Sequence, residues 1–285
     1  MKRAANPKIG YDGARGGLRA FCRPFAGLIL PILIAIMTGQ TSSQAALSAT
    51  NLASSGDTTN TTAYTTASFT PTANLLIVAF FDASRGSSTA PDIPTLSGGS
   101  LSWSQVGDLT WTTTGTTRFR VTCFAAQVGG SPSSMTVTAT YANALTGCQW
   151  SVFQVSGSDV ANGVAQCFVQ AVASSANLTG TSISITLSSA GNANNRAFLC
   201  VAHASNETYT IATNWSQIGA GGNNSPSTSI GSQWRSDTFD TNPNTSWTTS
   251  TNYGGIGFEV KADTSGGAAA LFRNRTGSRA RVTNP

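Results

Sequence analysis

The sequence predicts an all-β protein, a β-sandwich of jelly-roll type built from two duplicated β units. The first observation is composition: only 9% of the 285 residues are charged, 40% are hydrophobic, and Thr, Ser, Gly and Asn are abundant. Such residues favour short strands joined by tight turns. The second is that no apolar pattern of helical period runs for ten residues or more, whereas alternating and short continuous apolar runs recur. The third is an internal repeat.

Four blocks occur twice in the same order, and they pair residues 75–84 with 197–205, 103–107 with 215–219, 135–141 with 247–253, and 150–155 with 255–260. The clearest pair is WSQVG against WSQIG, each beginning with a tryptophan, Trp103 and Trp215. The blocks LLIVAFFDAS and AFLCVAHAS align at their shared Ala-Ser ends. The repeat predicts two β units of about a hundred residues that bury their apolar faces together.

The strands follow in order along the chain. Residues 47–70 predict edge strands, and the continuous apolar run at 75–81 predicts a strand covered on both faces. Alternation at 135–141 and at 182–187 predicts strands with one apolar and one hydroxylated face. Further strands are expected at residues 118–127, 149–156, 196–203, 229–235, 247–249 and 256–260.

We expect three regions. Residues 1–45 carry basic residues, then a 13-residue apolar run at 25–37 interrupted by Pro31, and they predict a signal peptide or N-terminal anchor. Residues 46–262 form the β-sandwich, with repeat units at about 60–157 and 179–262. Residues 263–285 form a disordered basic tail. The protein is then extracellular or on the cell surface, and it meets a membrane only through the N-terminal segment if that segment is uncleaved.

The net charge of +5 comes from the two ends of the chain. Between Ala46 and Lys261 there are six basic and nine acidic residues. A folded domain that binds nucleic acid presents a basic face. We therefore expect no nucleic-acid binding by the folded body.

Catalytic and metal motifs are weak. The single histidine, His203, has Glu207 four residues on, but no Gly-x-Ser-x-Gly nucleophile motif accompanies it, so we expect a structural histidine. Several Asp residues in loops leave a polysaccharide hydrolase or lyase as a minor alternative. The cysteine spacing fits no zinc cluster and no calcium loop motif is present, so we expect no cofactor, although loop Asp and Asn residues leave structural calcium open.

Four cysteines lie in the body: Cys123, Cys148, Cys167 and Cys200. If the chain is exported, they allow three disulfide connectivities. Buried free thiols acting as small hydrophobic residues are the alternative.

Two tryptophans, Trp111 and Trp150, have no aromatic counterpart in the other unit. An unmatched tryptophan can stack on a sugar ring or fill an interface. Ordinary burial is the alternative reading. These two residues are the ligand-binding candidates of the sequence.

The buried apolar strand, the Trp-Ser block and the closing strand GIGFEVK at 255–261 resemble uncharacterised Ser/Thr-rich β-sandwich proteins of bacteriophage and environmental bacterial sequences. The resemblance covers about residues 75–261 and implies virion or surface proteins. We expect a secreted or surface-displayed, non-catalytic protein for binding or adhesion, with a glycan or cell-surface ligand. A phage virion structural or receptor-binding protein that self-assembles is the alternative.

Overall fold

The computed structural model describes residues 46–113 and 115–264, which belong to one compact unit. These residues form antiparallel β-sheets and two short 3-10 turns, with no α-helix among them, so the all-β prediction is confirmed. No helix in these ranges is long and apolar enough to cross a membrane. The predicted segment at 1–45 and all but the first two residues of the predicted tail lie outside the described residues.

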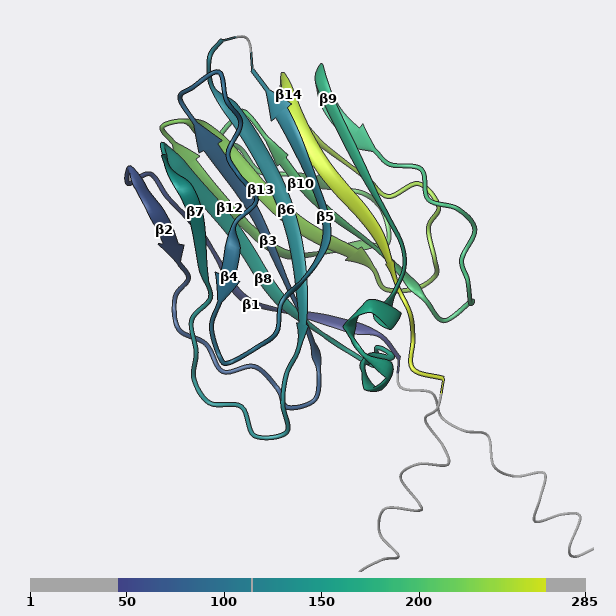
Figure 1. Ribbon diagram of the computed structural model, residues 1–285. Helices are drawn as coiled ribbons and strands as arrows, with labels where there is room; N and C mark the ends of the chain where they lie inside the picture. Colours follow the sequence, from purple (N-terminus) through teal and green to yellow (C-terminus); the bar gives the residue numbers. More distant parts are fainter. Residues whose placement is uncertain (1–45, 114, 265–285) are drawn as a thin grey trace, which may run out of the picture. The chain divides into compact units, whose positions relative to one another are not determined.

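The first half of the chain forms a five-stranded sheet with the order β1-β8-β3-β6-β5 (Figure 1). These strands span Ser48–Asp57, Gly147–Ser156, Leu76–Arg85, Arg118–Gln127 and Ser104–Thr112, respectively. β3 is central and buried almost throughout, as its continuous apolar run predicts.

The second half forms a second sheet in which β9, β14, β10, β13 and β12 are neighbours in that order. They span Phe168–Ser184, Asn244–Val260, Arg196–His203, Ser227–Arg235 and Trp215–Asn224, respectively. β11 (Thr210–Ile211) pairs with the first part of β14. The turns η1 (Val160–Asn162) and η2 (Val164–Cys167) connect the two halves.

The five-stranded sheet of the first half and the six-stranded sheet of the second half pack face to face around a shared apolar core. Phe153 of the first sheet stacks on Phe198 of the second, with ring centroids 6.0 Å apart and planes at 4°. Phe198 also stacks on Phe258, at 5.3 Å. Burying each such ring contributes about 1.5–3 kcal/mol, so this inter-sheet core stabilises the pairing of the halves.

The outer face of each sheet is covered as well. In the first half, β2 (Thr61–Thr65), β7 (Thr138–Leu145) and β4 (Thr95–Ser97) form a three-stranded sheet over it. In the second half, β11, the first part of β14 and the end of β9 take that place, around Tyr209 and Trp247. Because both faces are covered, β3 and β10 read as unbroken apolar runs.

The repeated pentapeptides begin edge strands. WSQVG runs into β5 and WSQIG opens β12, and each strand ends its sheet. Each pairing with the neighbouring strand shifts register at the same place, between Gln105 and Gly107 and between Gln217 and Gly219. A bulge at an edge bends the strand and discourages pairing with another chain.

The strand order does not confirm the jelly roll. That architecture winds two Greek keys through a pair of sheets. Here each of the two large sheets is made by one half of the chain alone.

Candidate functional site

The structure buries the first candidate, Trp111, completely. It lies on β5 and points into the inter-sheet core, where its ring stacks on Phe119 with centroids 4.0 Å apart. Its indole Nε1 donates to Oδ1 of Asp82 at 3.3 Å. No ring face is left for a sugar, so a stacking role for Trp111 is not retained.

The second candidate, Trp150, is 5% exposed and belongs to the core on the outer face of the first sheet. Its Nε1 is buried without a hydrogen-bond partner in the described chain. Trp150 therefore fills space between β8 and the covering sheet. It is not a surface platform, so its proposed stacking role is not retained either.

His203 and Glu207 do not form a catalytic pair. The imidazole is fully buried, stacks on Trp247 at 4.6 Å, and has no partner for either nitrogen among the described residues. Burial lowers the pKa of His203 to about 4, against an opposing effect of Glu207. The Glu207 carboxylate accepts hydrogen bonds from the amides of Thr248 and Thr249, each at 3.0 Å. His203 is a core residue, as its isolation in the sequence suggested.

Glu207 lines a surface hollow of about 250 Å3 in the second half of the chain. We call it the Tyr209 groove, and the residues that line it include Asn206, Glu207, Tyr209, Gln217, Gly222 and Ser229. They come from the connection after β10, from the edge strand β12 and from β13. Because β12 ends the sheet, the groove opens beside a strand that has only one neighbour.

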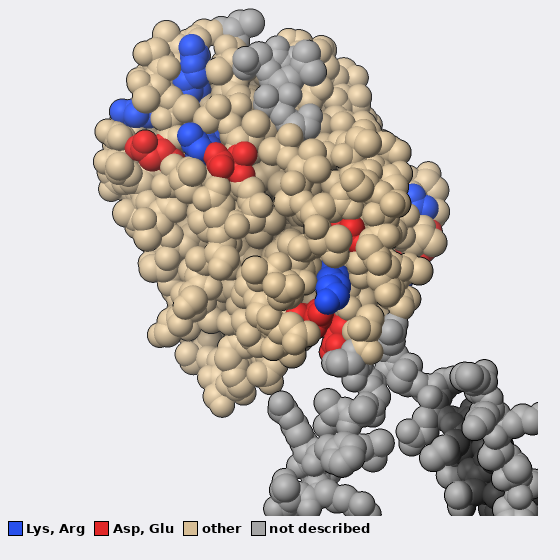
Figure 2. All heavy atoms as spheres, turned by 45° about the vertical axis from the view of Figure 1, so that its right-hand side comes forward, with Lys and Arg blue, Asp and Glu red and all other residues tan. Residues whose placement is uncertain are grey.

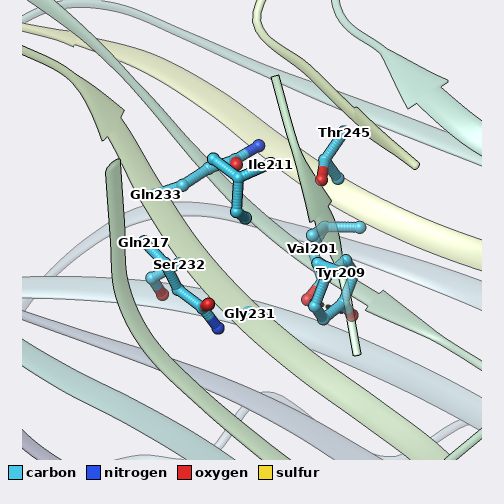
Figure 3. A pocket seen from close by; sticks show the side chains of 8 residues that line it. All are labelled: Val201, Tyr209, Ile211, Gln217, Gly231, Ser232, Gln233 and Thr245. Carbon is cyan, nitrogen blue, oxygen red and sulfur yellow. Dashed lines mark hydrogen bonds between the residues drawn. The ribbon is translucent and has the colours of Figure 1, made fainter. Parts of the chain in front are cut away.

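A second, separate hollow is a slot that is too narrow to hold a water molecule, and it shares Tyr209 and Gln217 with the groove (Figure 3). Tyr209, Val201 and Thr245 lie on one side, and Gln217, Gly231 and Ser232 lie across from them. Gly231 makes room for the tyrosine, because a Cβ there would lie 2.8 Å from the ring. The Tyr209 hydroxyl donates to the carbonyls of Val201 and Ser229, at 3.2 and 3.0 Å.

Gln233 ends the slot. Its Nε2 donates to the carbonyl of Asn244 at 3.0 Å, but its Oε1 is buried and has no partner among the described residues. A buried acceptor without a donor costs about 1–3 kcal/mol. The slot therefore holds a buried carbonyl oxygen whose hydrogen-bonding capacity the described residues leave unused.

The carboxylate in the groove is permanently charged. Partial burial would raise the pKa of Glu207, but hydrogen bonds from Ser205 and from the amides of Thr249 and Thr248 lower it to about 2. Glu207 therefore stays an acceptor at ordinary pH and cannot deliver a proton. The other side chains named here, Asn206, Gln217 and Ser229, are neutral hydrogen-bonding groups.

The face of the molecule drawn in Figure 2 carries few charged side chains, and some of opposite sign lie side by side. Arg120 pairs with Asp108, Arg235 with Asp237 and Asp240, and Lys261 with Asp159 at 2.6 Å. In the ranges that the structure covers, no three His, Cys, Asp or Glu residues gather in a way that would hold a metal ion.

Sequence reasoning did not find the Tyr209 groove. Its one local signal was Gln217, which lies inside the repeated WSQIG, but the matching Gln105 instead donates to Asp108 at 2.8 Å. No family model, curated protein or solved structure matches the chain. The fold and the groove define the class alone: an antiparallel β-sandwich protein with a polar groove, holding one ionised carboxylate, at one sheet edge.

Proposed function

We propose that this chain is a secreted or surface-displayed, non-catalytic binding protein, and that the Tyr209 groove takes a hydroxyl-rich ligand such as the end of a glycan. The observation that carries the proposal is the groove itself. It is walled by neutral hydrogen-bonding side chains and one ionised carboxylate held by two backbone amides. A few well-placed polar groups in a concave site provide specificity for a small ligand.

A binding role fits the groove better than catalysis. Glycoside hydrolysis by the common route needs one carboxylic acid and one carboxylate flanking the bond. Glu207 is the single carboxylate among the groove residues, and with a pKa of about 2 it is not protonated near neutral pH. We therefore propose no hydrolase or lyase activity at this place.

Duplication of one unit, followed by divergence of its side chains, accounts for the groove lying in the second half alone. We propose that the halves are two copies of one unit, supported by their shared strand order and by matching bulges at Val106 and Ile218. Gln105 pairs with Phe124 in the first half, and Gln217 pairs with Gln233 in the second. The second copy thus has a polar side chain where the first has an aromatic one.

Glycan-array binding of the full-length protein tests the proposal, with Glu207→Gln and Gln217→Ala as groove variants. Gln105→Ala is the matched control, because it removes the same side chain from the equivalent edge strand. We expect each groove variant to weaken binding about tenfold, the equivalent of one hydrogen bond to a charged or buried partner. The control variant should bind like the parent protein. Equal loss in Gln105→Ala and Gln217→Ala would contradict the assignment.

Self-assembly as a virion or surface subunit is the alternative. It is favoured by the edge strands β1 and β9, each of which has a single partner strand. An exposed edge is a template for pairing with another chain. No array binding, together with particles or filaments in light scattering, would favour this alternative over the glycan proposal.

A further inference from the structure

The core between the two sheets contains one cysteine from each sheet. Cys123 lies on β6 of the first sheet and Cys200 on β10 of the second, and both are fully buried. Burial first, and then the neighbouring Cys200 thiol, raise the pKa of Cys123, so the two side chains are neighbours in this core. The Cys200 Sγ is also 3.5 Å from the hydroxyl of Ser232.

The strands on either side confirm that the sheets approach each other closely here. Gly107 is the partner of Cys123 across β5 and β6, and Ile256 is the partner of Cys200 across β10 and β14. A Cβ on Gly107 would lie 3.4 Å from Cγ2 of Ile256. The cross-strand neighbours of the two cysteines therefore meet across the interface between the sheets.

The other two cysteines of the described chain have other close partners, although Cys167 borders the same core. Cys148 belongs to the outer core of the first sheet, with its Sγ 3.6 Å from the hydroxyl of Tyr141. Cys167 lies in η2, and its Sγ is 3.7 Å from the carbonyl of Gly163. Of the pairings that four cysteines allow, the packing brings together Cys123 and Cys200.

We propose that Cys123 and Cys200 form a disulfide that joins the two sheets when the chain folds in an oxidising compartment. Each thiol loses its proton, and together they give up two electrons to a small-molecule disulfide such as oxidised glutathione. One protein S–S bond forms, and the S–S bond of the oxidant breaks to give two thiols.

The bond forms during folding and not afterwards. Burial, together with the neighbouring Cys200 thiol, raises the pKa of Cys123 well above its usual range. Only a thiolate attacks a disulfide, so the folded, closed sandwich reacts slowly. Once formed, the bond closes a long loop between the sheets and restricts the unfolded chain, which is the main way a disulfide stabilises a protein.

Oxidative refolding of the full-length protein tests this. The reduced, denatured chain is refolded with oxidised and reduced glutathione, denatured again without reductant, alkylated and weighed. Of its five cysteines, we expect three alkylated thiols and one internal disulfide. Cys148→Ser and Cys167→Ser should keep the disulfide, whereas Cys123→Ser and Cys200→Ser should lose it.

Thermal unfolding provides a second readout. Reductant should lower the Tm of the oxidised parent protein and of Cys148→Ser by roughly 10 °C, and should leave Cys123→Ser unchanged. Five alkylated thiols in the refolded parent protein would overturn the proposal, as would a disulfide that persists in Cys123→Ser. The thiol count of the parent protein decides the matter even if a cysteine variant does not fold.

Discussion

The two halves of the sandwich share their strand order and edge bulges but fill matched positions with different side chains. The repeat makes Phe153 of the first half equivalent to Phe258 of the second. Val78 pairs with Phe153 and Phe198 pairs with Phe258, so Val78 and Phe198 occupy equivalent positions. By the same register, Gly255 stands where the first half has Trp150. Ile183 fills that space, because a Cβ on Gly255 would lie 2.7 Å from its Cδ1.

The ionisable groups differ even more. Asp82, in the inter-sheet core, is matched by Ala202, and His203, in the outer core, is matched by Ala83. Asp82 and His203 are therefore buried titratable side chains that the other half lacks at the matched position, and they lie on opposite faces of their sheets. Shared strand pairing fixes the fold, whereas the side chains on each face are free to diverge.

The largest expected effect concerns the core that joins the halves. Trp111→Ala removes a fully buried ring that stacks on Phe119, and we expect it to cost about 3–5 kcal/mol in the free energy of unfolding. Urea unfolding followed by circular dichroism measures this. Near-parental stability, with loss of ligand binding, would instead restore Trp111 as a contact residue.

A second effect is the dependence of stability on pH from His203. The unfolded chain protonates this histidine near pH 6.5, and the folded chain does so near pH 4. Stability is therefore full above about pH 6.5 and falls as the pH drops towards 4, by about 3 kcal/mol in total. His203→Phe removes this contribution. Identical pH profiles of unfolding for the variant and the parent protein would show that the ring is not buried as a neutral group.

For the buried carboxyl group of Asp82, we expect stability to depend on pH in the opposite direction. Burial raises its pKa well above the usual range, although the hydrogen bond from Trp111 lowers it. The contribution of Asp82 to the free energy of unfolding is full below about pH 4, the pKa of this group in the unfolded chain. It is lost as the pH rises towards the higher pKa of the folded protein. Asp82→Asn keeps an acceptor for Trp111 without the charge. We expect this variant to be more stable than the parent protein by more than about 1 kcal/mol at pH 8, with a smaller gain at pH 4 in the same urea assay. A gain that is larger at pH 4 than at pH 8 would contradict this assignment.

The smallest expected effect is that of salt on ligand binding. The proposed binding at the Tyr209 groove uses neutral groups and one carboxylate, and salt screens charged contacts with a Debye length of about 8 Å at physiological ionic strength. Affinity for a neutral glycan should therefore change less than about twofold between 50 mM and 500 mM NaCl by isothermal titration calorimetry. Binding that disappears in moderate salt would point to basic residues outside the groove.

The fold class was readable from the sequence because alternation and short apolar runs depend on local pattern. The exact register was not. Aligning the two sequences at their shared Ala-Ser ends makes Ala79 equivalent to Cys200. In the structure, however, Ala79 pairs with Phe124 and Leu199 pairs with Gln233. Because Phe124 and Gln233 are equivalent positions of the two halves, the true equivalent of Ala79 is Leu199. A slip of one residue moves every side chain to the other face of the sheet, and Cys200 does lie in the inter-sheet core while Leu199 lies in the outer one.

The candidate site could not be predicted from the sequence, for a related reason. Nothing in the sequence near Trp111 or Trp150 tells which face of a doubly covered sheet it meets, so the sequence left both burial and ligand stacking open. The Tyr209 groove combines residues from a connection, an edge strand and its neighbour. Only tertiary packing brings Glu207 beside Gln217.

The central claim is that the second half carries a ligand site that the first half lacks. Amide chemical-shift mapping of the full-length protein, titrated with the glycan that binds best on the array, tests it most directly. We predict shifts at Glu207, Gln217 and Gly222 and none at Gln105 or its neighbours. Equal shifts around Gln105 and Gln217, or shifts confined to the first half, would contradict the claim.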